Sequence, residues 1–81
     1  MKNKEFLIKV QRGGVTIFSA DGKIEHAFLR RLKNGKVVRT FYESICDGIL
    51  SEGTDHSNMG RAITETKQRI KIVLELKKPG R

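Results

Sequence analysis

Hydrophobic and polar residues alternate through the first half of the chain, and this two-residue period predicts β-strands. Near the start, the apolar positions fall at Phe6, Ile8 and Val10, which is the spacing of a half-buried strand. The next apolar segment is rich in β-branched and aromatic residues, which strands favour. We expect antiparallel strands at about 5–10, 15–19, 23–33 and 36–42.

Glycine-containing turns separate these strands and predict their register. The pairs Asp21-Gly22 and Asn34-Gly35 are typical of two-residue type I′ turns, whose central residues both need positive φ. Such turns place Arg30 opposite Arg39 and Phe28 opposite Phe41. They also place Ile17 opposite His26 and Val15 opposite Phe28.

This register divides the sheet into an apolar core face and a more polar second face, because successive side chains point to opposite sides. The expected core face holds Val15, Ile17, Ile24, Phe28, Leu32, Val37 and Phe41, with Arg30 and Arg39 among them. The expected second face holds Thr16, Phe18, Ala27, Leu29, Arg31, Lys33, Lys36, Val38, Thr40 and Tyr42.

The last third of the chain is more ambiguous. Segment 41–50 has the spacing of a short helix weakened by Gly48, and segment 51–60 resembles a loop. From Thr64 to residue 77, good helix formers follow a capable N-cap, although Ile70, Ile72, Leu74 and Leu76 also alternate as in a strand. The predicted fold is a single α+β domain, 1–81, with a four-stranded antiparallel meander followed by a C-terminal helix.

The net charge of +8 narrows the choice of partner. Seventeen Lys and Arg stand against nine Asp and Glu, with a pI near 10.1. Residues 1–40 and 61–81 are strongly basic, whereas 41–60 contains four acids and no Lys or Arg. A field of this sign attracts polyanions, so we expect only part of the surface to face nucleic acid.

Cations and aromatic rings on an open sheet are typical of single-strand binding, because the cations follow phosphates while bases stack on the rings. The candidate nucleic-acid-binding residues are Lys9, Arg12, Phe18, Arg30, Arg31, Lys33, Lys36, Arg39, Tyr42 and Arg61. The alternative is that the apolar members pack against the final helix and the lysines are simply solvated. Arg30 opposite Arg39 would be explained by a bound anion or by side chains reaching the sheet edge.

Other chemistry is weakly represented. His26 and His56 lack neighbours at metal-ligand spacing, and His26 is expected in the core. The single Cys46 excludes an intramolecular disulfide and fits a reducing compartment. We expect a cytoplasmic protein that is not an enzyme, with no cofactor, no metal, no small-molecule substrate and no membrane association.

Three short stretches carry a family resemblance: Ser19-Ala20-Asp21-Gly22-Lys23, Lys33-Asn34-Gly35-Lys36, and 56–64 with its Met59-Gly60-Arg61-Ala62-Ile63-Thr64. With the strand order, they resemble the positive-cofactor-four-like single-stranded-DNA-binding family, particularly its small bacterial branch. The resemblance implies a homodimer formed through the helices and a concave sheet that grips single strands. It also implies phosphate contacts from Arg31, Lys33, Lys36 and Arg61. The chain lacks the tryptophan of that branch, and 44–54 looks like an insertion.

These patterns predict a nucleic-acid-binding accessory or regulatory protein, such as a transcription regulator, that favours single-stranded DNA or RNA and is a homodimer. One alternative is a phage or mobile-element factor that binds a host or transcription protein. Another is a small ribonuclease toxin, in which Arg61, His56 and Tyr42 would act on RNA.

Overall fold

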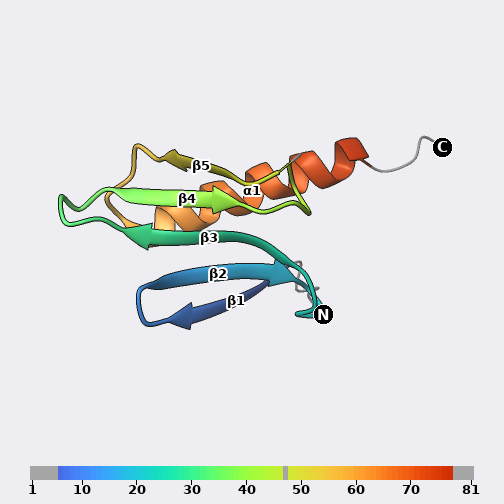
Figure 1. Cartoon of the computed structure of the whole chain (residues 1–81), viewed down its shortest axis with the longest axis horizontal. Helices are drawn as coiled ribbons and strands as arrows, with labels where there is room; N and C mark the ends of the chain where they lie inside the picture. The colour runs from blue at the N-terminus through green and yellow to red at the C-terminus, as the bar shows by residue number, and fades with distance from the viewer. Residues whose placement is uncertain (1–5, 47, 78–81) are drawn as a thin grey trace.

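One antiparallel sheet and one C-terminal helix make up the fold, so the predicted α+β class is confirmed. The computed structural model describes residues 6–46 and 48–77. In these residues the strands follow each other in the sheet in the order in which they occur along the chain (Figure 1). They are β1 (Phe6–Gln11), β2 (Gly14–Ser19), β3 (Glu25–Arg31), β4 (Val37–Phe41) and β5 (Leu50–Gly53), and the helix is α1 (Met59–Lys77).

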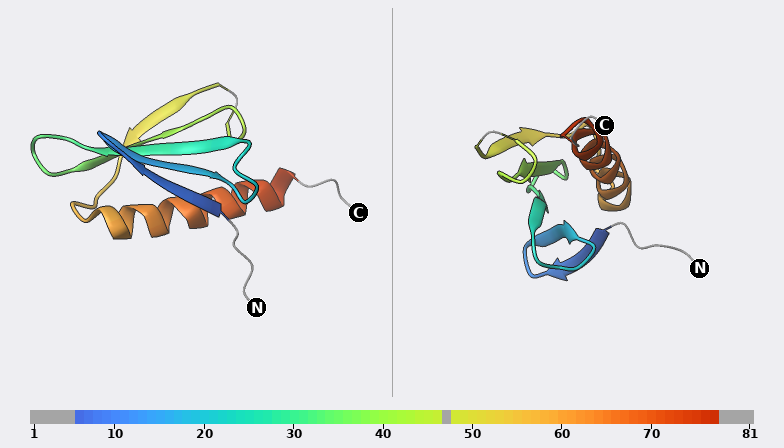
Figure 2. Two further views of the ribbon diagram at one scale, coloured as in Figure 1. Left: turned by 90° about the horizontal axis from the view of Figure 1, so that it is seen from below. Right: turned by 90° about the vertical axis from the view of Figure 1, so that its right-hand side faces the viewer.

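The core lies between α1 and one face of the sheet, which curves around the helix (Figure 2). On α1, the buried positions Ala62, Thr66 and Ile70 recur every four residues, which aligns them in one stripe facing the strands. On the sheet, the buried side chains that face this stripe include Ile17, Leu29, Val37 and Phe41. The convex side of the sheet is not covered by a helix in the part of the chain that the structure describes.

The β3–β4 turn differs from its prediction. The Leu32 amide donates to the Lys36 carbonyl at 2.8 Å, and the Gly35 amide donates to the Leu32 carbonyl at 2.9 Å. Gly35 has a φ of 91°, whereas Asn34 does not have positive φ. The turn therefore has three loop residues with glycine alone in the left-handed region, which is the second common hairpin geometry.

One extra loop residue shifts the β3–β4 register by one position. Leu29 lies opposite Arg39 and Arg30 lies opposite Val38, so the predicted pairing of Arg30 with Arg39 is wrong. The predicted pairing of Phe28 with Phe41 is also wrong, because Phe41 pairs with Ala27.

A β-bulge shifts the β2–β3 register in the same way. Ile17 pairs with Ala27 and Phe18 pairs with Glu25, which leaves His26 as the extra residue of β3. The predicted pairings of Ile17 with His26 and of Val15 with Phe28 are therefore wrong. Val15 pairs with Leu29 instead.

Because a one-residue slip exchanges the two faces of a strand, β3 is turned over relative to its prediction. Ala27 and Leu29 are completely buried under α1, whereas both were expected on the second face. Phe28 and Arg30, expected in the core, point to the convex side, and Ile24 is exposed. Val15, Ile17, Val37 and Phe41 were correctly assigned to the core.

The acidic middle of the chain contains a strand rather than a helix. Strand β5 pairs with β4 along its whole length, from Phe41 opposite Leu50 to Val38 opposite Gly53, so the predictions of a helix near 41–50 and of a loop from residue 51 are wrong. The predicted C-terminal helix is confirmed, but it begins at Met59 rather than near Thr64. Its N-cap is Asn58, whose Oδ1 accepts from the Arg61 amide at 3.0 Å.

His26 is a buried core residue, as predicted. Its Nδ1 lies 2.7 Å from Ser44 Oγ, and Ser44 Oγ donates to the Glu25 carbonyl at 2.9 Å. Since that serine proton is already used, Nδ1 of His26 is the donor to the serine oxygen. The His26 and Phe6 rings are T-shaped to each other, with centroids 5.9 Å apart.

Acidification is expected to destabilise the protein through His26. Burial lowers the pKa of His26 below its ordinary value of 6.5, so the unfolded chain takes up a proton in a range where the folded chain does not. The free energy of unfolding should therefore fall as the pH drops below about 6.5. Hydrogen bonds lower the pKa values of Asp21 and Glu65, and these carboxyls act in the same direction only at more acidic pH.

Urea denaturation between about pH 7.5 and about pH 5.5 measures this dependence. His26→Gln, which cannot take up a proton, should show a shallower decline than the unchanged chain. An equal decline in both proteins would show that another group is responsible.

Candidate nucleic-acid interface

The convex side of the sheet, which we call the open face, carries a mixture of cations, hydroxyls and aromatic rings. Strand register puts Lys9, Thr16, Phe28, Thr40 and Ser51 in one row across all five strands. The other members of the open face are Leu7, Gln11, Phe18, Arg30 and Val38.

The polar groups of the open face are held by contacts within it. Thr16 Oγ1 donates to Gln11 Oε1 at 3.0 Å, and the hydroxyls of Thr40 and Ser51 lie 2.9 Å apart. The charged side chains of Lys9 and Arg30 are exposed. The face therefore offers the Thr40 and Ser51 hydroxyls near the sheet surface and cations that extend into solvent, whereas Thr16 is buried.

A second group of cations gathers at one end of the molecule, which we call the basic end. The β1–β2 turn, the β3–β4 turn and the start of α1 lie there, at the left of Figure 1. Arg31 Nη2 donates to the Ser57 carbonyl at 3.1 Å, which joins the end of β3 to the segment before α1. The exposed cations of the basic end are Arg12, Arg31, Lys33, Lys36 and Arg61, and Asp55 is an exposed acid beside Arg61.

In the described part of the chain, carboxylates outnumber cations at the opposite end of the sheet, which we call the acidic end. The β2–β3 turn and the segment after β4 bring Asp21, Glu25 and Glu43 to that end, together with Lys23. An exposed charge distribution of this kind orients an approaching polyanion toward the basic end.

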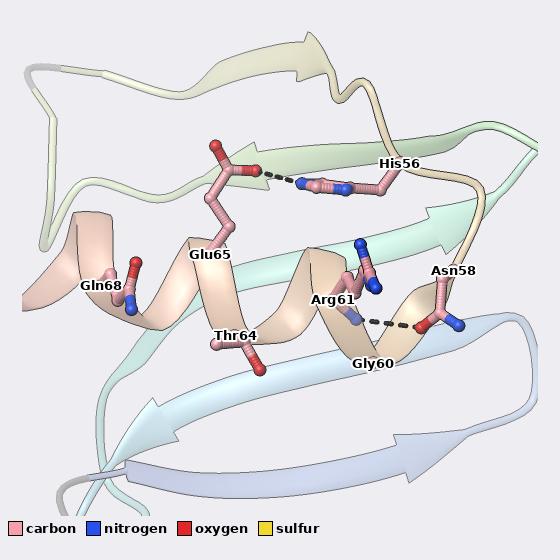
Figure 3. A pocket seen from close by; sticks show the side chains of 7 residues that line it. All are labelled: His56, Asn58, Gly60, Arg61, Thr64, Glu65 and Gln68. Atoms are coloured by element: carbon pink, nitrogen blue, oxygen red, sulfur yellow. Dashed lines mark hydrogen bonds and ion pairs between the residues drawn. The ribbon is translucent and has the colours of Figure 1, made fainter.

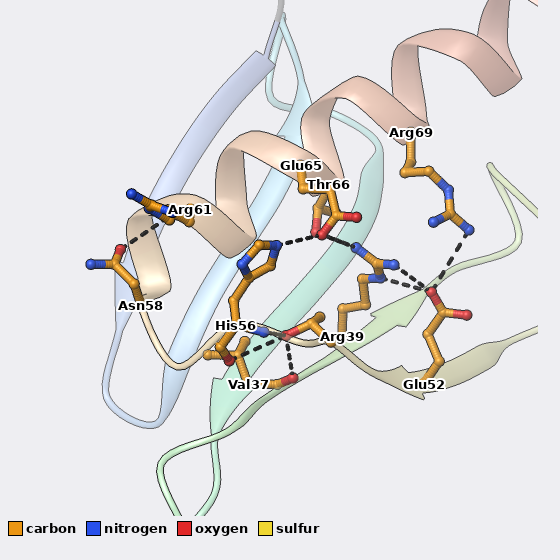
Figure 4. A network of polar contacts seen from close by, with 10 residues as sticks. Val37, Arg39, Glu52, His56, Asn58, Arg61, Glu65, Thr66 and Arg69 are labelled. Atoms are coloured by element: carbon orange, nitrogen blue, oxygen red, sulfur yellow. Dashed lines mark hydrogen bonds and ion pairs between the residues drawn. The ribbon is translucent and has the colours of Figure 1, made fainter.

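Arg39 lies on the helix-facing side of the sheet, away from the open face and the basic end. Its side chain is 5% exposed and sits under α1 (Figure 4). Its Nη2 lies 2.7 Å from Glu52 Oε2, and its Nε donates to the same oxygen at 2.8 Å. Nη1 reaches Thr66 Oγ1 at 3.4 Å and Glu65 Oε1 at 3.5 Å. These contacts give Arg39 a role in holding α1 to the sheet, so we do not include it in the interface.

The same network extends to His56. Its Nε2 lies 2.8 Å from Glu65 Oε1, and since a carboxylate only accepts, Nε2 is the donor. This hydrogen bond holds the pKa of Glu65 below its ordinary value, and the charge of Arg39 adds to the effect. Strands β4 and β5, the segment before α1 and α1 itself are thereby joined by charged contacts.

A groove of about 750 Å³ runs along the first turns of α1 (Figure 3). Its lining includes His56, Arg61 and Glu65. His56 and Arg61 therefore share one site, as the ribonuclease alternative requires. Tyr42 does not join them, because it directly follows β4 and lines a different pocket; the end of β4 and the start of α1 lie at opposite ends of the molecule (Figure 1).

Tyr42 occupies a different surface from the other candidates. It lines a shallow depression with Lys23, Glu25 and Glu43. Burial raises the pKa of its hydroxyl above the ordinary value, and the charge of Glu25 adds to the increase. With carboxylates beside it, Tyr42 is a poor partner for a phosphate backbone.

The structure thus separates the sequence-predicted site residues into groups. Lys9, Phe18 and Arg30 lie on the open face, and Arg12, Arg31, Lys33, Lys36 and Arg61 belong to the basic end. Arg39 and Tyr42 lie elsewhere. The sequence reasoning missed Phe28 as a surface residue, and a three-residue reading of the Lys33-Asn34-Gly35 turn would have found it, because it restores the observed register.

Among the described residues, no three His, Cys, Asp or Glu side chains are grouped as a metal site would require. Within the same residues, α1 is not long and apolar enough to span a membrane. Cys46 is a free, half-buried thiol that packs against the core.

Comparison with known proteins identifies no relative, since no family model, curated protein or solved structure matches the chain.

Proposed function

We propose that the protein is a nucleic-acid-binding accessory or regulatory protein that prefers single-stranded DNA or RNA. The observation that carries the proposal is the open face, an uncovered sheet surface on which Lys9 and Arg30 flank the ring of Phe28. Single-strand binding needs cations for the phosphates and rings for the bases on one surface. Both are present here.

The basic end adjoins the open face at the β3–β4 turn. Arg30 lies one residue before Arg31 at the end of β3, and the Lys33–Lys36 turn follows directly. A strand lying on the open face would therefore continue over cations as it leaves the sheet. The resemblance to the single-stranded-DNA-binding family implies a concave gripping surface, whereas in this chain α1 occupies the concave side. The proposal accordingly uses the convex side.

Fluorescence anisotropy with labelled single-stranded DNA, duplex DNA and single-stranded RNA tests the proposal. Affinity should fall steeply between about 50 mM and about 200 mM salt, because each neutralised phosphate releases counterions. Gel analysis of the recovered RNA separates binding from cleavage, the outcome that a ribonuclease would give. Absence of binding to every oligonucleotide would overturn the proposal and favour a factor that binds a host protein.

Removing two cations of the basic end should weaken binding without changing its sequence preference. We expect Lys33→Gln together with Lys36→Gln to lower the slope of log affinity against log salt by about 2. Lys23→Gln, at the acidic end, is the matched control and should leave the slope unchanged. Equal effects from both variants would mean that the basic end has no special part in binding.

We also propose that the chain is a homodimer through the exposed side of α1. Ile72 and Leu76 lie one turn apart and are 57% and 79% exposed. Contact between these side chains and their copies in a second chain would remove both apolar surfaces from water. Sedimentation equilibrium measures the oligomeric state, and a monomer at high concentration would overturn this part of the proposal.

A further inference from the structure

We infer that Phe28 is the residue on which an unpaired nucleotide base stacks, and that it gives the protein its preference for single strands. The inference rests on the proposed function and deepens it. It concerns a residue whose sequence pattern had predicted a place in the core.

The position of the Phe28 ring depends on Gly14. A Cβ built on Gly14 would lie 2.5 Å from Phe28 Cζ and 2.8 Å from Phe28 Cε1. The ring therefore reaches from β3 onto β2 and rests on the Gly14 backbone, where a larger residue would collide both with the ring and with the Leu29 carbonyl oxygen. Phe28 is half-buried rather than buried, so part of the side chain remains accessible to solvent.

A ring held in this way suits base stacking. Because the ring already packs against Gly14, we expect it to lose little conformational freedom when a ligand binds. Thr16, directly opposite Phe28, is 4% exposed, so it is covered and the ring stands over a filled surface. A base arriving from solvent meets the accessible part of the side chain.

The cations beside Phe28 suit the phosphates that flank a stacked base. On the open face, Lys9 lies across Thr16 from Phe28, and Arg30 lies two residues along β3. These cations provide charge for phosphates on either side of the stacked base. Cations attract duplex and single strands alike, but only an unpaired base can reach a ring on a sheet surface, so the ring supplies the discrimination.

Phe18 is the second ring of the open face, and it has a less favourable setting. It lies opposite Glu25, at the end where the carboxylates gather. Phe28 lies toward the basic end, because Gly14, on which it rests, begins β2 beside the β1–β2 turn. We therefore assign the principal stacking role to Phe28 rather than to Phe18.

Tryptophan substitution tests the inference directly, because the chain contains no tryptophan. In Phe28→Trp, oligothymidylate should quench the single indole fluorescence on binding, since a stacked base contacts the ring. Ile49→Trp, at a 65% exposed position in the depression that Tyr42 lines, is the matched control and should report no quenching. A DNA hairpin of equal charge should quench Phe28→Trp far less than oligothymidylate does.

Affinity measurements with Phe28→Leu complete the test. Leucine keeps an apolar cover over Gly14 but offers no ring, so affinity for oligothymidylate should fall about tenfold while hairpin affinity stays within about twofold. Unchanged oligothymidylate affinity in Phe28→Leu, or absence of quenching in a folded Phe28→Trp, would overturn the inference while leaving the proposed function intact. Failure of the unchanged protein to bind either oligonucleotide would instead overturn the proposed function.

Discussion

Replacing Leu29 with alanine is expected to lower the free energy of unfolding by about 3 kcal/mol. Leu29 is completely buried on the central strand β3, and truncating a buried leucine loses both its transfer free energy and the contacts around the resulting cavity. Urea denaturation followed by far-ultraviolet circular dichroism measures the loss.

The same experiment tests the register of the sheet. A two-residue turn at Asn34-Gly35 would put Leu32 in the core and Leu29 on the second face, so Leu32→Ala would then be the more damaging change. With the observed three-residue turn, Leu29→Ala should cost clearly more than Leu32→Ala, because Leu32 is only half-buried. Ile49→Ala, at a 65% exposed position outside the strands and α1, should change stability by less than about 0.5 kcal/mol.

Replacing Glu52 with leucine is expected to cost about 3 kcal/mol, because it leaves the Arg39 charge buried without its main partner. Arg39 is 5% exposed, and both Nε and Nη2 contact Glu52 Oε2. Glu65 remains at 3.5 Å, but it contacts only Nη1. Thermal or urea denaturation of the variant measures the cost.

The double variant Arg39→Met with Glu52→Leu separates a buried-charge penalty from general damage to β4 and β5. Removing both charges should recover most of the lost stability, since a buried ion pair is often no more stable than an apolar pair of similar volume. Glu43→Leu, at an exposed position away from this network, is the single-residue control. A double variant as unstable as Glu52→Leu alone would show that the network stabilises the fold by means other than charge pairing.

The Leu29→Ala and Glu52→Leu variants both test how α1 is held against the sheet. Leu29 belongs to the apolar contact between α1 and β3, and Glu52 belongs to the charged contact between α1, β4 and β5. Arg39 forms ion pairs with Glu52 and Glu65 in this network, so these three charges are not available to bind a polyanion. The attraction of a polyanion that the net charge of +8 predicts must therefore come from the cations of the open face and the basic end.

Local pattern was sufficient to predict several elements. The alternation around Phe6, Ile8 and Val10 predicted β1, and the residues of 15–19 predicted β2, because in both cases one face is apolar and local turns bound the strand. The helix was predicted from residue 64, and its start was placed too late because the Asn58 cap lies before a glycine that weakens helix propensity. Strand β5 was not predicted, because its four residues, Leu-Ser-Glu-Gly, have little β propensity.

By itself, the sequence determined the α+β class, the antiparallel order of the first four strands, the burial of His26 and the strong positive charge. Each of these depends on residue type and on spacing within one segment. Only the tertiary structure decided which face of β3 is buried, because a single extra residue in a turn and in a bulge reverses that face without changing the local pattern. That reversal buries Leu29, exposes Phe28 and Arg30, and places Arg39 beneath the helix. The candidate interface follows from pairing across strands, which residue spacing along one strand does not specify.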